Sequence, residues 1–169
     1  PTLRGHPPEL ELGERFDLPG FIETPDPGVR IEVPPAIESV FPVASLAYYL
    51  GAEVVPGVEP RIVADGFEQP LESAGIGFER TVSRVLKQTF FLDCLTRTEG
   101  NRGPPLHERA ALEEVVSVPL GNLYDAPPGE RLSAYFDIPY ETVEPLLPRW
   151  KLTAHVQAEA PHVSILPFL

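Results

Sequence analysis

One long segment of the chain carries the pattern of hydrophobic and polar positions that is typical of a helix. In residues 78–99, Val82, Val85 and Thr89 recur three and four positions apart, with charged residues between them. This spacing places the apolar residues on one helical face. Residues 90–95 are nearly all apolar, and a helix that loses its polar face is buried on more than one side. The pattern therefore predicts a long helix whose second half lies at the centre of the core.

Other segments alternate between apolar and polar residues with the period of two that is typical of a strand. Residues 29–33 and 150–158 show this alternation, and residues 54–71 contain Asp65-Gly66 between two apolar runs. Asp-Gly in that position is a hairpin signal, in which both turn residues are expected to take positive φ. We predict a small mixed sheet built from these three segments.

Proline and glycine mark the ends of several shorter elements. A helix is expected to begin behind Pro42 and to end at Gly51, because Gly supplies a left-handed cap at no steric cost. The shorter helices are expected at residues 43–50, 106–114, 129–136 and 140–147, with a short strand at 115–118. The predicted fold class is therefore α+β, with a small mixed sheet packed against one long central helix plus shorter helices.

Length and composition predict one compact domain. The chain has 169 residues, of which 43% are hydrophobic, enough for one core. Residues 1–35 contain eight of the 22 prolines, so we expect an extended proline-rich segment laid over the body, followed by a single α+β domain at 36–169. Because the chain contains no methionine and stops on an apolar ILPFL, it is expected to be an internal piece of a longer protein.

The charge balance suggests a salt-rich environment. The chain carries 25 acids against 13 bases, a net charge of −12, and its only lysines are Lys87 and Lys151. Acid-rich surfaces stay soluble where salt screens repulsion, which indicates a halophilic cytoplasm; an ordinary acidic protein from a GC-rich genome is the alternative. Such a surface disfavours nucleic acid and anionic membranes as partners. A single cysteine, Cys94, excludes an intramolecular disulfide and fits a reducing, cytoplasmic location.

The residues with the most obvious catalytic chemistry are Asp93, Cys94 and His107. A thiolate activated by an imidazole is the basic plan of cysteine hydrolases. The apolar surroundings of Cys94 instead predict a buried, inert thiol that serves packing, and His107 is expected on the surface. Isolated histidines and one cysteine do not form a metal cluster, so neither a metal nor a cofactor is expected.

Two further groups of residues could bind a partner or ligand. Asp93, Arg97, Glu99 and Arg102 cluster at the end of the long helix, where ion pairing explains them as well as acid–base work does. Tyr48 and Tyr49, next to Gly51, are expected at the core or its boundary, and a ligand platform is the alternative interpretation.

Four segments carry a family resemblance: FPVASLAYYLGAEVVPG, FFLDCLTRTEG, LHERAALEE and RWKLTAHVQAEAPHVSILPFL. They resemble a region of haloarchaeal proteins that lies ahead of a caspase-like peptidase domain of the CHAT type. In that family the catalytic histidine precedes the cysteine, each at the end of a core strand. Here Cys94 precedes His107 and both fall in predicted helices, so no family catalytic residue is carried over. The resemblance implies a companion domain whose peptidase unit would follow Leu169.

These observations favour a non-catalytic structural, interaction or regulatory domain of a larger intracellular haloarchaeal protein. Its expected partner is another protein domain, in cis or in trans. The alternative is a cysteine-dependent hydrolase using Cys94 and His107. A third class, small-ligand binding, would require a cavity beside Tyr48 and Tyr49.

Overall fold

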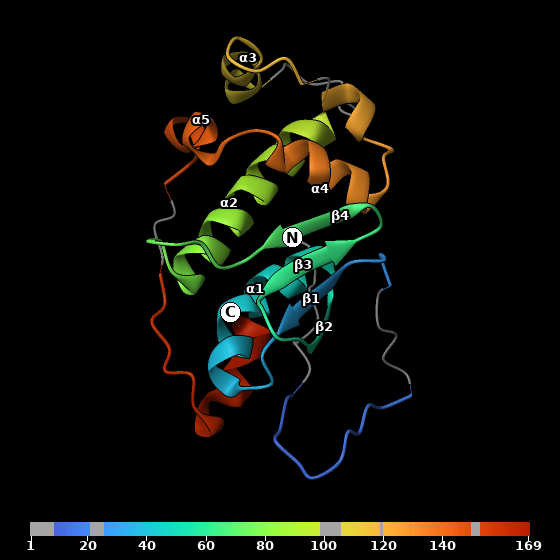
Figure 1. Cartoon of the computed structure of the whole chain (residues 1–169), viewed down its shortest axis with the longest axis vertical. Coiled ribbons are helices and arrows are strands. Elements are labelled where there is room, and N and C mark those ends of the chain that lie inside the picture. Colours follow the sequence, from blue (N-terminus) through green and yellow to red (C-terminus); the bar gives the residue numbers. More distant parts are fainter. Residues whose placement is uncertain (1–8, 21–25, 99–105, 119, 150–152) are drawn as a thin grey trace, which may run out of the picture.

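The protein has an α+β fold in which helices cover one face of a small mixed sheet (Figure 1). The computed structural model describes residues 9–20, 26–98, 106–118, 120–149 and 153–169. The predicted fold class is confirmed. The strands are β1 (Arg30–Val33), β2 (Glu53–Pro56), β3 (Arg61–Ala64) and β4 (Phe67–Pro70).

The strand order in the sheet is β2-β1-β3-β4. The central strand β1 pairs with β2 in parallel and with β3 antiparallel, and β3 and β4 form the predicted hairpin. Both edge strands end in proline, Pro56 in β2 and Pro70 in β4. Proline cannot donate to another strand, so it limits how far either edge can be extended.

The two faces of the sheet differ sharply in polarity. Ile31 lies opposite Ile62 in the register of β1 and β3, and both are fully buried. On the other face Glu32 lies opposite Arg61, and their side chains form an ion pair of 2.7 Å. This alternation is the period-two pattern of a sheet with one solvated face, and it directs the helices to the Ile31 side.

Helix α1 (Ile37–Leu50) begins six residues earlier than predicted. Pro42 was expected just before the helix but lies inside it. The helix nevertheless continues N-terminally from Pro42 because Val40 and Phe41 add to its apolar face, so tertiary burial offsets the hydrogen bond that proline cannot donate. The predicted end is confirmed: Gly51 has φ 63° and its backbone N–H closes the last turn.

Helix α2 (Phe78–Arg97) connects two hydrophobic clusters and is the central element that the sequence predicts. Its first half packs with the sheet and α1, through Val82 and Val85. Its second half packs with the later helices, through Phe91, Leu92 and Leu95. Burial is not all round, however, because Phe90 is 39% exposed.

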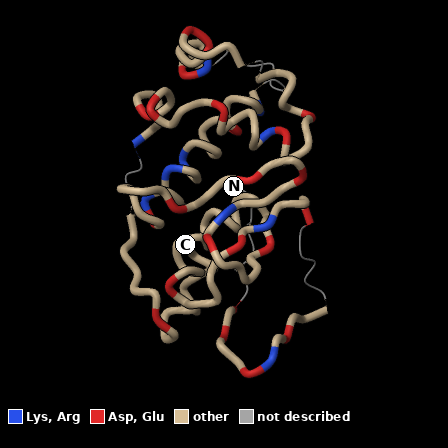
Figure 2. Tube along the Cα trace, in the orientation of Figure 1, with Lys and Arg blue, Asp and Glu red and all other residues tan. Residues whose placement is uncertain are grey.

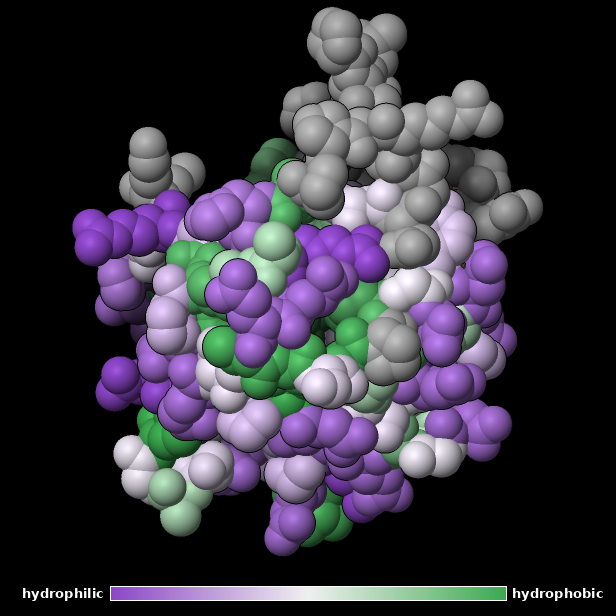
Figure 3. Space-filling view, turned by 90° about the horizontal axis from the view of Figure 1, so that it is seen from above, coloured by the Kyte–Doolittle hydropathy of each residue, from purple (hydrophilic) through white to green (hydrophobic). Residues whose placement is uncertain are grey.

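The remaining helices pack around the second half of α2. They are η2 (Leu120–Leu123), α3 (His107–Glu113), α4 (Pro128–Phe136), α5 (Tyr140–Val143) and η3 (Glu144–Leu146). α3 and α5 lie at the end of the molecule away from η4 (Ala160–Phe168), which contacts α1 (Figure 1). Seen from that end, green hydrophobic residues lie between purple hydrophilic ones (Figure 3).

Gln88 ties α2 to the end of α4. Its side-chain Nε2 donates to the backbone carbonyls of Tyr135, at 2.8 Å, and Ile138, at 2.7 Å. Tyr135 lies in the last turn of α4 and Ile138 lies two residues beyond the helix, so this buried amide supplies a donor to the carbonyls around the helix end, where intrahelical donors run out. The arrangement fixes α4, and with it Tyr135, against α2.

Four further sequence predictions are wrong. The strand predicted at 150–158 is absent from residues 153–158, which are mostly exposed, and residues 150–152 lie outside the described residues. Residues 115–118 form no strand either. Residues 9–20 are exposed and project as a loop instead of lying over the body (blue, Figure 1). In the hairpin, only Gly66 takes positive φ, 67°, while Asp65 does not. The alternation in residues 153–158 does not indicate which strand would pair with them, and neither proline-terminated edge strand of the sheet does so.

Acidic residues are spread over the sheet, the helices and the loops (red, Figure 2). Basic residues on α2 and on the sheet lie among them (blue, Figure 2). Among the described residues, no helix combines the length and the apolar character that crossing a bilayer requires.

Candidate functional site

A buried carboxylate, Asp93, is the centre of the candidate site. Asp93 is 5% exposed although it is charged. Its place in α2 explains this, because Val82, Val85, Thr89, Asp93 and Thr96 follow the helical period on one side, and all are buried. A carboxylate removed from water costs several kcal/mol unless donors replace its hydration.

Two tyrosine hydroxyls donate to this carboxylate. Tyr135 in α4 donates to Oδ1 at 2.9 Å, and Tyr49 in α1 donates to Oδ2 at 2.8 Å. The Tyr135 hydroxyl forms a second hydrogen bond, of 2.8 Å, with Thr96 Oγ1. Asp93 therefore links three helices that are far apart in sequence.

Two arginines complete the surroundings of Asp93. Arg97, one turn further along α2, places Nη2 3.2 Å from Oδ2. Arg131 from α4 places Nε 3.4 Å from Oδ1. Their attraction offsets part of the cost of burying the carboxylate. The two guanidinium groups and one carboxylate give the site a local charge of about +1, against the negative charge of the whole chain.

The environment of Asp93 keeps both tyrosines in their protonated form. Burial is the largest cause that raises the pKa of Tyr49, followed by the negative charge of Asp93. Burial also leads the causes that raise the pKa of Tyr135, although its hydrogen bond with Thr96 acts the other way. Both hydroxyls are therefore donors throughout the neutral range, which suits them to hold a carboxylate.

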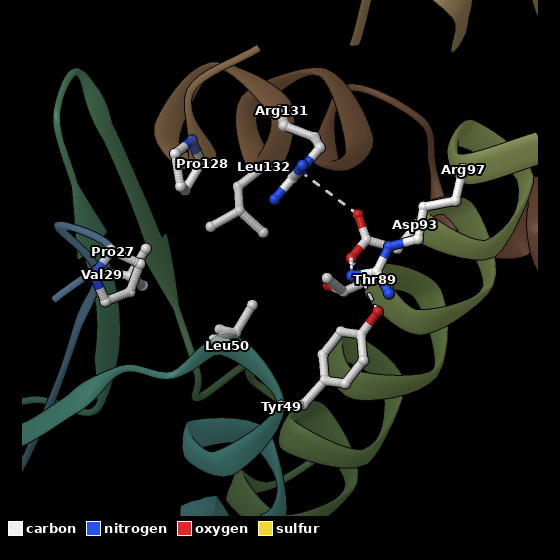
Figure 4. Close-up of a pocket in the computed structure, with 10 residues that line it drawn as sticks. All are labelled: Pro27, Val29, Tyr49, Leu50, Thr89, Asp93, Arg97, Pro128, Arg131 and Leu132. Atoms are coloured by element: carbon white, nitrogen blue, oxygen red, sulfur yellow. Dashed lines mark hydrogen bonds and ion pairs between the residues drawn. The ribbon is translucent and has the colours of Figure 1, made fainter. Parts of the chain in front are cut away.

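A cavity of about 190 Å³ opens beside this cluster (Figure 4). One wall is polar and is formed by Tyr49, Thr89, Asp93, Arg97 and Arg131. The facing wall is apolar and is formed by Pro27, Val29, Leu50, Pro128 and Leu132. Figure 4 shows the two walls on opposite sides of the space, with α2 and α4 supplying the charged groups. The cavity beside Tyr49 that small-ligand binding requires is thus present.

Thr89 is the polar residue in this wall whose hydrogen bonding is incomplete. It is 1% exposed, and its Oγ1 has no hydrogen-bond partner among the described residues. Figure 4 shows the side chain on the cavity side of α2. Buried hydroxyls are nearly always paired, so this unpaired hydroxyl beside the cavity is a candidate partner for a bound group.

The prediction that Cys94 is buried packing material is wrong. Cys94 is exposed because it lies one turn after Phe90 on the outer side of α2, opposite the stripe that contains Asp93. The prediction that its thiol is not activated is supported by its surroundings. Partial burial is the largest cause that raises the pKa of Cys94, and the negative charge of Asp93 adds to it, while Arg97 opposes both.

His107 is exposed at the start of α3, as predicted. Among the described residues, no hydrogen bond joins it to Cys94, and His107 is not among the groups that shift the Cys94 pKa. The structure therefore does not assemble Asp93, Cys94 and His107 into a catalytic set. Asp93 instead faces the interior, away from the exposed thiol.

The other predicted site residues separate into two groups. Tyr49 and Arg97 belong to the cluster around Asp93, and the predicted ion pair of Arg97 with Asp93 is present. Tyr48 is 83% exposed instead of lying at the core or its boundary, because it lies on the solvent-facing side of α1. Glu99 and Arg102 lie outside the described residues. Within the described ranges, no group of three or more His, Cys, Asp or Glu side chains is placed to hold a metal.

Sequence reasoning missed three members of the cluster: Thr89 as a cavity residue, Arg131 and Tyr135. The helical period of α2 could have indicated that Asp93 is buried, because it continues the stripe of Val82 and Thr89. A buried aspartate then requires donors. No sequence signal shows that α4 supplies them, since its docking depends on long-range packing.

Comparison of the chain with protein-family models, with curated proteins and with solved structures finds no match.

Proposed function

We propose that this chain is a non-catalytic interaction or regulatory domain of a larger, cytoplasmic haloarchaeal protein. Its proposed partner is another protein domain, in cis or in trans, and the linked caspase-like unit implied by the sequence resemblance is the first candidate.

The observation that supports this proposal is the structural use of Asp93. Both of its oxygens accept hydrogen bonds or pair with cations, from Tyr49, Tyr135, Arg97 and Arg131. A general acid or base needs access to substrate and a proton to exchange. A carboxylate surrounded by four donors from its own fold instead fixes the helices relative to one another.

The proposed contact surface consists of Tyr48, Phe90 and Cys94, and we call it the aromatic surface. Tyr48 is 83% exposed at the end of α1. Its neighbour Tyr49 contacts Phe90 edge to face, with ring centroids 5.5 Å apart, which brings the end of α1 beside α2. Exposed aromatic side chains are enriched at protein interfaces, and they stand out on an acidic, strongly hydrated surface.

The alternative function, a cysteine-dependent hydrolase, has one observation in its favour, the exposure of Cys94. Two others oppose it. The thiol pKa is raised, whereas catalytic cysteines have lowered values. His107, the proposed base, forms no hydrogen bond with Cys94.

Photocrosslinking from Cys94 tests the proposed interaction in the full-length gene product. Cys94 is the only cysteine of these 169 residues and lies on the aromatic surface. Once every cysteine outside residues 1–169 is replaced by serine, a maleimide carrying a photoreactive group reports what covers Cys94. We expect crosslinked peptides from a second protein domain. The variant Tyr48→Ser should reduce their yield about tenfold, because an interface tyrosine commonly contributes 2 kcal/mol or more.

Tyr124→Ser is the matched control, because Tyr124 is also an exposed tyrosine but follows η2 and is not one of the three residues of the aromatic surface. Its crosslinking yield should equal that of the unchanged protein. Crosslinks confined to residues 1–169, or equal losses in both variants, would contradict the proposal.

A further inference from the structure

The cavity beside Asp93 is built for a ligand with two unlike ends. Its polar wall contains the cations Arg97 and Arg131 together with Thr89, and its apolar wall contains Leu50 and Leu132 among other residues. An empty cavity left by imperfect packing would have apolar walls throughout, and a cavity that held only water would have polar groups on most sides. Opposed walls of this kind instead orient a small amphipathic molecule.

The groups that remain unused in the polar wall favour an anion. Asp93 already receives donors at both oxygens. Arg131 pairs with it through Nε at 3.4 Å, and no hydrogen bond from either of its Nη groups is found among the described residues. Thr89 Oγ1 is buried and unpartnered. A planar guanidinium with free donors matches a carboxylate, and the Thr89 hydroxyl can donate to the same group.

The size of the cavity limits the ligand. About 190 Å³ is below the range of roughly 300–1,000 Å³ of pockets for drug-sized ligands. The negative charge of the whole chain does not prevent an anion from binding, because at molar salt repulsion is screened beyond about 3 Å. The positive charge of Arg97 and Arg131 then determines that the cavity attracts an anion.

We propose that this cavity binds a small monocarboxylate with a short branched apolar body, whose carboxylate meets Arg131 and Thr89 and whose body contacts Leu50 and Leu132. The proposal is independent of the partner proposed for the aromatic surface, which lies on the outer side of α2. It adds a ligand site to the domain and requires no reaction.

Calorimetric titration of the protein with potassium 3-methylbutanoate, at constant molar potassium, tests the proposal. A ligand of this size is expected to bind with a Kd on the order of 1 mM or below. Two probes serve as controls: 3-methylbutanamide, which has the same body without the charge, and potassium phosphate, which is an anion without the body. Neither should bind comparably.

Three variants locate the binding. Thr89→Val should weaken it several-fold while leaving the melting temperature unchanged or higher, because it removes a buried unpaired hydroxyl and keeps the shape. Arg131→Gln should weaken it about tenfold or more. Arg80→Gln, which removes an exposed charge elsewhere on α2, should leave it unchanged. Arg131→Gln also removes an ion pair of Asp93 and can destabilise the protein. If Arg131→Gln unfolds, Thr89→Val still decides the test.

Several outcomes would overturn the proposal. One is no heat of binding up to about 50 mM carboxylate, far above the expected Kd. Another is equal binding of the amide, which would remove the role of the charge. Phosphate binding as tightly would show an anion site without selectivity for the apolar body. Binding that Thr89→Val and Arg131→Gln leave unchanged would place the carboxylate elsewhere.

Discussion

At the scale of single residues, Asp93 and Cys94 are neighbours in sequence with opposite surroundings. Successive residues of a helix point about 100° apart, so one turns inward and the other outward. Asp93 is buried among donors from three helices, and Cys94 is exposed beside Phe90. The charged residue thus belongs to the interior and the thiol to the surface, the reverse of what their polarity alone favours.

The raised pKa of Cys94 leads to a prediction about its reactivity. The thiolate is the reactive form, so alkylation by iodoacetamide should be slow at pH 7. The rate should increase about tenfold per pH unit until it levels off above about pH 8.5, the ordinary thiol value. Because partial burial raises the Cys94 pKa and Arg97 lowers it, Arg97→Gln should move this midpoint to higher pH. Mass spectrometry of the labelled chain measures the rates.

His107→Ala is the control for the hydrolase alternative. With no hydrogen bond between His107 and Cys94, the labelling profile should not change. A midpoint below about pH 7 that rises when His107 is removed would show an activated thiol and contradict a non-catalytic role.

At the scale of elements, local patterns predicted most of the helices and strands. The period of α2, the alternation of β1, the Gly51 cap and the Asp65-Gly66 hairpin each depend on a few neighbouring residues. Local chemistry decides such features. The strand prediction for residues 153–158 was wrong because an alternating segment forms a strand only when it pairs with another strand, and the alternation does not indicate which strand that would be.

The candidate site was less predictable than the elements that carry it. Tyr49 and Arg97 were named as candidate site residues from the sequence. Because the residues around Cys94 are nearly all apolar, it was not recognised that Asp93 continues the buried stripe of Val82 and Thr89. Following that period through residue 97 predicts which side is buried. The contribution of Arg131 depends on how α4 docks, which involves contacts distant in sequence.

The docking of α4 against the hairpin gives a prediction at this scale. Gly129, in the first turn of α4, lies against the backbone of Asp65, and an added Cβ would overlap the Asp65 carbonyl oxygen. Alanine is the better helix former by up to about 1 kcal/mol, but backbone overlap costs about 1–3 kcal/mol. Gly129→Ala should therefore lower the melting temperature by several degrees, measured by circular dichroism.

Gly20→Ala is the matched control. Gly20 lies in the exposed loop, and an added Cβ would meet no atom within 4 Å. Its melting temperature should match that of the unchanged protein. A higher melting temperature for Gly129→Ala would mean that α4 does not dock on the hairpin as described.

At the scale of the whole molecule, charge is the property that the fold leaves unbalanced. The net charge is −12, and acidic residues occur in the sheet, the helices and the loops (Figure 2). The ion pairs found among the described residues engage only a minority of the 25 acids: Glu32, Glu68, Asp93, Glu113 and Glu141. The remaining carboxylates repel one another in the compact state, and this repulsion destabilises the fold at low salt.

Salt should therefore stabilise the protein, as the proposed haloarchaeal origin requires. Raising potassium chloride shortens the screening length from about 10 Å at 0.1 M to about 3 Å at 1 M, so the melting temperature should rise across this range. Glu53, Glu72 and Glu79 are exposed and make no ion pair among the described residues. Replacing all three by Gln should raise the melting temperature at low salt and reduce its salt dependence, because less repulsion remains to be screened. Calorimetric scans of both proteins measure the melting temperature at each salt concentration. A melting temperature that does not change with salt would contradict the halophilic interpretation. An unchanged salt dependence of the melting temperature in the triple variant would contradict it as well.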